Sequence, residues 1–149
     1  MSHLSTLKTN ITDLEALKRA LLHVGVKANQ IEVSTNGPRS AHGYHNDAFH
    51  ANLIVHKDMV RNFGSDIGWE KTADGTYAIH TDSYNYGPHQ HYDESWTNRL
   101  NTRYAVEKAK MSLDAKGVEY TESVDEKKRT VLTARFKTAE QSRFVRMGR

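Results

Sequence analysis

Residues 67–81 read IGWEKTADGTYAIHT, in which Asp74-Gly75 separates two runs of apolar and β-favouring side chains. Two such turn formers between strand-like runs favour a tight hairpin turn, in which both central residues take a positive φ. The sequence therefore predicts a β-hairpin here. We expect this hairpin to join one sheet beside the first strand of the chain or beside a strand at residues 49–55.

A strand and a helix are predicted near the N-terminus. Residues 4–9 favour a short strand, and residues 13–24 favour a helix, because leucines recur there at spacings of three and four. Thr12 and Glu15 have the spacing of a capping box at the helix start. Gly25 suits a left-handed stop at the helix end.

The region from residue 31 to residue 55 predicts two strands with a loop between them. Ile31 and Val33 indicate a short strand, and a polar loop is expected from Asn36 to Ala48. Apolar and polar side chains alternate strictly from Phe49 onward. This alternation predicts one continuous, half-buried strand over residues 49–55.

The C-terminal half predicts a long helix and a second hairpin. The helix spans about residues 94–116, and Gly117 ends it. Alternating side chains over residues 118–136, with a charged turn at 125–128, predict two more strands. The element order is β-α-β-β-β-β-α-β-β, so we expect an α+β fold in which two helices pack on one face of a mixed or antiparallel sheet.

The chain has 149 residues and no cysteine. This length suits one ordinary domain, which we place at residues 1–137, followed by a basic tail at residues 138–149. Without cysteine the sequence offers no disulfide framework, thiolate zinc site or cysteine nucleophile. It has no long apolar run and no signal-peptide pattern, so we expect a soluble cytoplasmic protein without membrane insertion.

Positive charge is concentrated at the C-terminal end. Residues 127–149 contain eight basic residues and one acid, a net +7, which leaves −4 for the rest of a chain whose net charge is +3. A basic end on an acidic body favours contact with nucleic acid, with an anionic partner surface or with a second copy of the chain. The binding candidates in this segment are Arg135, Lys137, Arg143, Phe144 and Arg146.

Several stretches resemble the Ycf35 family, also called DUF1257, of cyanobacteria, algal plastids and some phages. They are Met1 to Thr9 with the following helix start, Ala51 to Val55, Asp66 to Trp69, Asp74 to Tyr77, Arg103 to Ala105, Gly117-Val118 and Val131-Leu132. The resemblance covers about residues 1–137 in the family's order. It implies a small accessory protein with a protein partner, since some members resemble accessory proteins found beside AAA-type ATPases. It supplies no catalytic residues, and it extends the expected location to a plastid stroma or a host cytoplasm.

Histidine is the residue type with the richest chemistry in this chain. His42 and His45 lie in one expected loop, and His89 and His91 lie in another. Imidazole binds zinc, copper, nickel and iron, so these four histidines form a metal site if the two loops meet at one end of the sheet. We expect them not to converge, because glycine and proline beside them favour exposed turns, and we expect no cofactor.

Tyrosines stand beside the second pair of histidines. The binding candidates in this loop are Tyr84, Tyr86, His89, His91 and Tyr92. Tyrosine offers a large contact area with little rotamer entropy, as recognition surfaces require. The sequence has no phosphate loop, nucleophile elbow or metalloprotease motif. We therefore expect a non-enzymatic binding protein that uses these loops and the tail; the alternatives are nucleic-acid binding through the tail and a histidine metalloprotein.

Overall fold

The largest sheet in the described residues is antiparallel and five-stranded, with the strand order β1-β7-β6-β5-β2, and we call it the central sheet because other elements cover both of its faces. The computed structural model describes residues 4–42, 48–57, 65–82 and 94–135. The strands of this sheet are β1 (Leu4–Leu7), β2 (Ile31–Val33), β5 (Leu53–Val55), β6 (Ile67–Lys71) and β7 (Tyr77–Asp82). The predicted hairpin is confirmed as β6–β7, and it pairs with β1 on one side and with β5 on the other.

The turn of this hairpin differs from the predicted one. Gly75 has φ +88°, but Asp74 does not have a positive φ. The backbone N–H of Thr72 donates to the carbonyl of Thr76 at 2.8 Å, so the loop is longer than two residues. The Asp74 carboxylate fills it, accepting from the Thr72 and Thr76 hydroxyls at 2.5 and 2.6 Å. These bonds, the one from Thr72 first, hold the pKa of Asp74 well below its usual range.

The prediction of one strand over residues 49–55 is wrong, because the strand is interrupted at Asn52. Residues 48–51 form β4 (Ala48–Ala51), which belongs to another sheet than β5. The Asn52 backbone N–H donates to the Trp69 carbonyl, and its side-chain oxygen accepts from the Lys71 N–H at 2.9 Å. The irregularity reverses the alternation, so Phe49 and Ile54 share one apolar cluster while Leu53 joins the main core.

A strand also replaces part of the predicted polar loop. β3 (Arg39–His42) pairs with β4 in a hairpin that covers one face of the sheet. The Phe49 ring of this hairpin lies directly over Gly68 of β6. A Cβ at position 68 would lie 2.5 Å from a Phe49 ring carbon and 2.6 Å from the Ala51 Cβ. Only glycine therefore permits this close approach of the hairpin to the sheet.

The two helices, α1 (Leu14–His23) and α2 (Glu94–Ala115), pack together on the other face of the sheet. The α+β class and the placement of both helices on one face are confirmed. A short 3₁₀ turn (Ala28–Gln30) leads from α1 to β2. The buried residues of this main core are Ile11, Leu17, Ala20, Leu21, Val26, Leu53, Val55, Ile67, Trp69, Ile79, Trp96 and Leu100. Neither of these helices is long and apolar enough to cross a membrane.

The start of α1 is capped differently from the prediction. Its N-cap is Asp13, whose carboxylate accepts from the backbone N–H groups of Glu15 and Ala16. The capping box of Thr12 with Glu15 is wrong, because the Glu15 side chain pairs instead with Arg19 at 3.3 Å. At the other end, the predicted left-handed stop is confirmed by a φ of +104° at Gly25.

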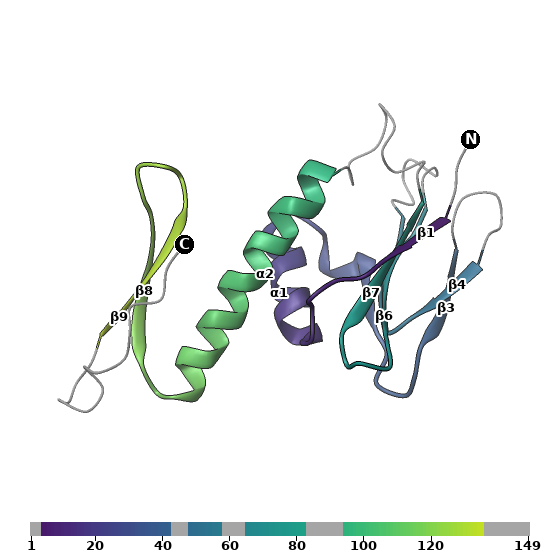
Figure 1. Cartoon of the computed structure of the whole chain (residues 1–149), viewed down its shortest axis with the longest axis horizontal. Helices are drawn as coiled ribbons and strands as arrows, with labels where there is room; N and C mark the ends of the chain where they lie inside the picture. Colours follow the sequence, from purple (N-terminus) through teal and green to yellow (C-terminus); the bar gives the residue numbers. More distant parts are fainter. Residues whose placement is uncertain (1–3, 43–47, 58–64, 83–93, 136–149) are drawn as a thin grey trace.

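The second predicted hairpin is confirmed, but it is not part of the central sheet. It consists of β8 (Glu119–Val124) and β9 (Thr130–Arg135), and we call residues 119–135 the arm. Figure 1 shows the arm and the sheet on opposite sides of α2. A separate cluster of Val106, Leu113, Val118 and Leu132 attaches the arm to the C-terminal half of the helix.

Candidate functional site

Two buried aspartates lie at the same end of neighbouring strands of the sheet. Asp66 directly precedes β6 and is 4% exposed, and Asp82 ends β7 and is fully buried. Side chains alternate along a strand, so Asp66 faces the same side as Gly68, and Asp82 the same side as His80. This is the side covered by β3–β4, because the Phe49 ring contacts Gly68 and lies 5.2 Å from the His80 ring, centre to centre.

Asp66 forms hydrogen bonds with the backbone at the ends of β3 and β5. Its carboxylate accepts from the backbone N–H of His42 at 3.0 Å and from that of Lys57 at 2.8 Å. Its own backbone N–H donates to the His42 carbonyl at 2.9 Å. Since buried carboxylates are rare unless they are paired or hydrogen-bonded, these bonds explain why Asp66 is stable here. Asp66 thereby fixes the ends of β3 and β5 next to β6.

Two histidines on this side are held by carboxylates. The His56 ring bridges Glu32, with Nε2 to Oε1 at 2.9 Å, and Asp66, with Nδ1 to Oδ2 at 3.7 Å. The His80 ring has Nε2 at 2.9 Å from Oε1 of Glu70. Its Nδ1 lies 2.8 Å from the Thr6 hydroxyl. The His80 ring forms hydrogen bonds through both nitrogens and the His56 ring through Nε2, so each ring connects neighbouring strands. In the described chain, no three His, Asp or Glu side chains are placed to hold a metal ion.

Most of the predicted loop site lies outside the described residues. His42 is described, as the last residue of β3. The others, His45, Tyr84, Tyr86, His89, His91 and Tyr92, are not among the described residues. The strand before the first histidine-rich segment ends at His42, and the strand before the second ends at Asp82. These two strand ends lie at the same end of the sheet (Figure 1). The convergence of the four histidines stays a prediction.

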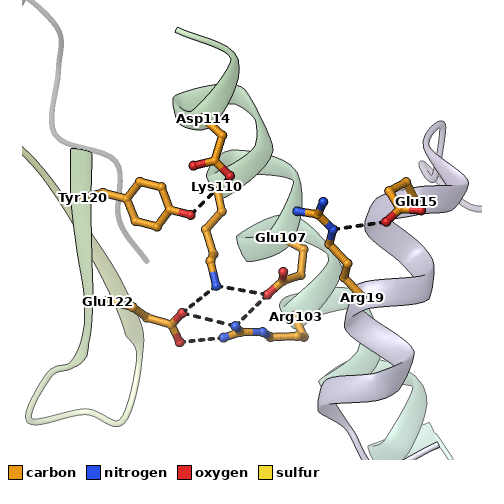
Figure 2. Close-up of polar contacts among 8 residues, drawn as sticks. All are labelled: Glu15, Arg19, Arg103, Glu107, Lys110, Asp114, Tyr120 and Glu122. Carbon is orange, nitrogen blue, oxygen red and sulfur yellow. Dashed lines mark hydrogen bonds and ion pairs between the residues drawn. The ribbon is translucent and has the colours of Figure 1, made fainter. Parts of the chain in front are cut away.

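A second polar site joins α2 to the arm (Figure 2). The Arg103 guanidinium forms a bidentate salt bridge with Glu122 of β8, with Nη1 to Oε2 at 2.7 Å and Nη2 to Oε1 at 3.2 Å. It also reaches Glu107 at 2.6 Å, and Lys110 bridges Glu122 at 3.2 Å and Glu107 at 3.7 Å. The network is electrically neutral, and Arg103 and Glu107 are buried. The bond from Arg103, before that from Lys110, lowers the pKa of Glu122 to about 2.

The described part of the basic segment lies on the arm. Lys127, Lys128 and Arg129 are exposed at its turn, where Lys128 has a positive φ of 62°. Arg129 is bound to Asp125 at 2.8 Å. Arg135 is exposed at the end of β9, opposite Glu119 in the strand register. The other candidates, Lys137, Arg143, Phe144 and Arg146, are not among the described residues.

The positioning role of Asp66 and the link from Arg103 to Glu122 are not predicted from the sequence. The signal for Asp66 is an acid directly before the apolar residues of a buried strand. The signal for Arg103 is a charged side chain within an apolar helix stripe, together with Glu107 one turn later. Neither signal identifies the partner. Asp66 binds backbone groups of residues distant in sequence, and Glu122, which binds Arg103, lies on another element.

A family model described as "Protein of unknown function (DUF1257)" matches residues 26–132. The matched span begins after α1 and ends within β9, so it includes Asp66, Asp82, Arg103 and Glu122. No curated protein and no solved structure matches the chain.

Proposed function

The chain belongs to the DUF1257 family, whose function is unknown, and we propose from its own surface that it is a non-enzymatic accessory protein whose arm and basic segment bind an acidic surface of a protein partner. The observation that carries this proposal is the separation of the arm from the central sheet. Within the described residues, α2 is the only element outside the arm that contributes to the small core beneath the arm. A two-stranded hairpin alone is only marginally stable, so the cluster and the Arg103–Glu122 pair hold the arm on α2, and the exposed side of the arm is left for a partner.

The charges of the arm support an acidic partner. Glu122 is already neutralised by Arg103 and Lys110. Lys127, Lys128 and Arg135 make no ion pair or side-chain hydrogen bond within the described residues, and all three are exposed. These basic groups are therefore available to a partner, and complementary charge increases both the association rate and the selectivity of such binding.

The network beneath the arm supports a preformed binding element. Arg103 holds Glu122 in a two-pronged pair, a geometry that restricts both side chains. A rigid element loses less conformational entropy on binding than a flexible one. The arm is thus able to meet its partner without first becoming ordered.

The test is binding to a purified AAA-type ATPase, the partner that the resemblance suggests first. The arm variant carries Lys127→Gln, Lys128→Gln and Arg135→Gln. The control carries Lys18→Gln, Arg19→Gln and Lys71→Gln, which removes the same charge from other surfaces. We expect about a tenfold weaker affinity for the arm variant, since three exposed charge contacts are lost, and an unchanged affinity for the control. Equal binding of the two variants would reject the arm as the interface.

Deletion of residues 138–149 tests the tail separately. We expect a nearly unchanged melting temperature and weaker partner binding, because this segment is too poor in apolar residues to form a core by itself. A large loss of thermal stability would show that the tail belongs to the folded domain. Salt-sensitive retention on nucleic acid, abolished by the same deletion, would favour the nucleic-acid alternative instead.

The second candidate function is a histidine metal site. It is favoured by the shared sheet end at which β3 and β7 terminate, in His42 and Asp82. The measurement is the metal content of untagged protein, compared with a variant that carries His89→Ala and His91→Ala. One equivalent of zinc or iron that the variant loses supports the site, with nitrogen to metal distances of about 2.0 Å. Our expectation is a substoichiometric content and no effect of chelator on stability.

A further inference from the structure

A hollow of about 490 Å³ lies where α1, α2 and the arm meet. Its polar lining residues are His23 at the end of α1, Asn98, Arg99, Thr102 and Arg103 on α2, and Thr130 at the start of β9. Two valines complete the lining. We call this space the basic hollow, because three of its lining residues are basic and none is acidic. Its volume is in the usual range of small-molecule sites.

Two of the three basic side chains have no partner within the described chain. Arg99 and His23 make no ion pair and no side-chain hydrogen bond there, and both are exposed at the rim. Within the described residues, the Thr130 hydroxyl likewise has no hydrogen-bond partner. These groups come from three different elements and border the same hollow, so together they form an unused set of hydrogen-bond donors.

Arg103 is the buried member of the residues that line the hollow. The residue is 8% exposed, and its terminal nitrogens are bound to Glu107 and Glu122. Its Nε is buried and has no hydrogen-bond partner. Buried donors are almost always satisfied, so this guanidinium N–H gains a partner if a small shift of the side chain brings it to an acceptor in the hollow.

The geometry points to the basic hollow as a binding site for a phosphate group of a small organic molecule. A phosphate carries several strong acceptor oxygens in different directions, which suits donors that arrive from α1, α2 and the arm. Arginine is especially suited to phosphate, because its planar fork donates two parallel hydrogen bonds. The remaining volume and the two valines leave room for an apolar part of the ligand.

A larger hollow, of about 1070 Å³ beside the start of α1, supports no comparable inference. One of its two lysines, Lys108, is paired with Asp13 at 3.3 Å. Its Tyr104 hydroxyl accepts from the backbone N–H groups of Thr12 and Asp13, at 3.0 and 3.1 Å. Asp13, Tyr104 and Lys108 thus already serve the start of α1 and its contact with α2.

The test is a titration of the full-length, ¹⁵N-labelled chain with pyrophosphate, with ADP and with a single-stranded oligonucleotide, followed by NMR. We expect pyrophosphate and ADP to shift the signals of Arg99, Arg103 and the His23 ring in a saturable way. Arg99→Gln should weaken both ligands by about tenfold, because one charge-assisted contact to phosphate is lost. Arg19→Gln removes the same charge from the exposed surface of α1, outside the hollow, and should leave both affinities unchanged.

Two results would overturn this inference. The first is a titration without saturable shifts, or with equal losses in Arg99→Gln and Arg19→Gln, which would mean that phosphate binds only through overall charge. The second is an Arg99-dependent affinity for the oligonucleotide alone, which would make the hollow a nucleic-acid contact. The inference does not rest on the partner proposed for the arm, since Lys127, Lys128 and Arg135 lie outside the hollow.

Discussion

The central sheet and the arm are both antiparallel, but they are stabilised in different ways. The sheet is covered on one face by two helices and on the other by β3–β4, and its main core contains two buried tryptophans, Trp69 and Trp96. The arm has one face against α2, a small apolar cluster and the charged network around Arg103. Burial of apolar area therefore dominates the stability of the sheet, whereas the arm depends on charges as well.

The most severe test of this difference is Trp69→Ala. Trp69 is 1% exposed on β6, in the middle of the main core. We expect the free energy of unfolding to fall by about 3 to 5 kcal/mol, from lost apolar burial and the cavity that remains. Urea denaturation followed by circular dichroism measures this loss. A loss below about 1 kcal/mol would mean that the sheet is not the main source of stability.

Gly68→Val tests the second face of the sheet. The new side chain would overlap the Phe49 ring and the Ala51 Cβ, which lie 2.5 and 2.6 Å from its Cβ position. We expect a loss of about 3 kcal/mol, because the hairpin β3–β4 must shift away from the sheet. In the matched cycle, Phe49→Ala combined with Gly68→Ala should cost less than the sum of the two single changes. Additive costs would show that Phe49 and Gly68 do not contact each other.

Leu132→Ala tests the arm in the same manner. Leu132 is 3% exposed and belongs to the cluster between β9 and α2. We expect the opening free energy of the arm to fall by about 2 kcal/mol, because the small cluster is able to relax. Hydrogen exchange should become faster in β8 and β9 and stay unchanged in β6 and β7. Equal acceleration in all four strands would mean that the arm and the sheet unfold as one unit.

The smallest expected effect is the dependence of the arm on pH. The pKa of Glu122 is about 2 in the folded chain and 4.5 without its partners. Its ion pairs therefore stabilise the arm fully above pH 4.5, and this contribution is lost as the pH falls from 4.5 to about 2. The effect is on the order of 1 kcal/mol, because water screens a side chain that is 32% exposed.

Glu122→Gln provides the matched control for this pH effect. Glutamine does not titrate, so the variant gains no proton at this position as the pH falls. Hydrogen exchange in β8 and β9 should therefore depend less on acid pH in the variant than in the unchanged chain. The exchange of β6 and β7 should be the same in the variant and in the unchanged chain. An identical acid dependence of the arm in both proteins would show that Glu122 is not the titrating group.

The elements that could be predicted from sequence are those with a local pattern. The hairpin at residues 67–81 has strand-like runs around Asp74-Gly75, and α2 has an apolar stripe that ends before Gly117. β3 has no such pattern, since only Ala41 of its four residues is buried, and its conformation depends on pairing with β4. The break at Asn52 could not be predicted either, because it depends on bonds to Trp69 and Lys71 from another strand.

The candidate sites were less predictable than the fold. Composition pointed to histidines such as His42, but the contacts that define the sheet end come from Asp66, whose partners are backbone groups of distant residues. The basic arm could be predicted, because charge density is visible in the sequence. Its attachment could not, because the pairing of Arg103 with Glu122 requires the relative position of a helix and a strand.

The order of the core residues along the chain has a consequence for synthesis. The last buried residue of the main core is Leu100, whereas the arm begins at Glu119. A chain is made from its N-terminus, and domains form as their segments become available. All residues of the sheet are therefore synthesised before those of the arm. When the arm is synthesised, α2 is already packed on the sheet through Trp96 and Leu100. The arm therefore packs against α2 late in folding. A chain that ends before residue 119 still contains every buried residue of the main core.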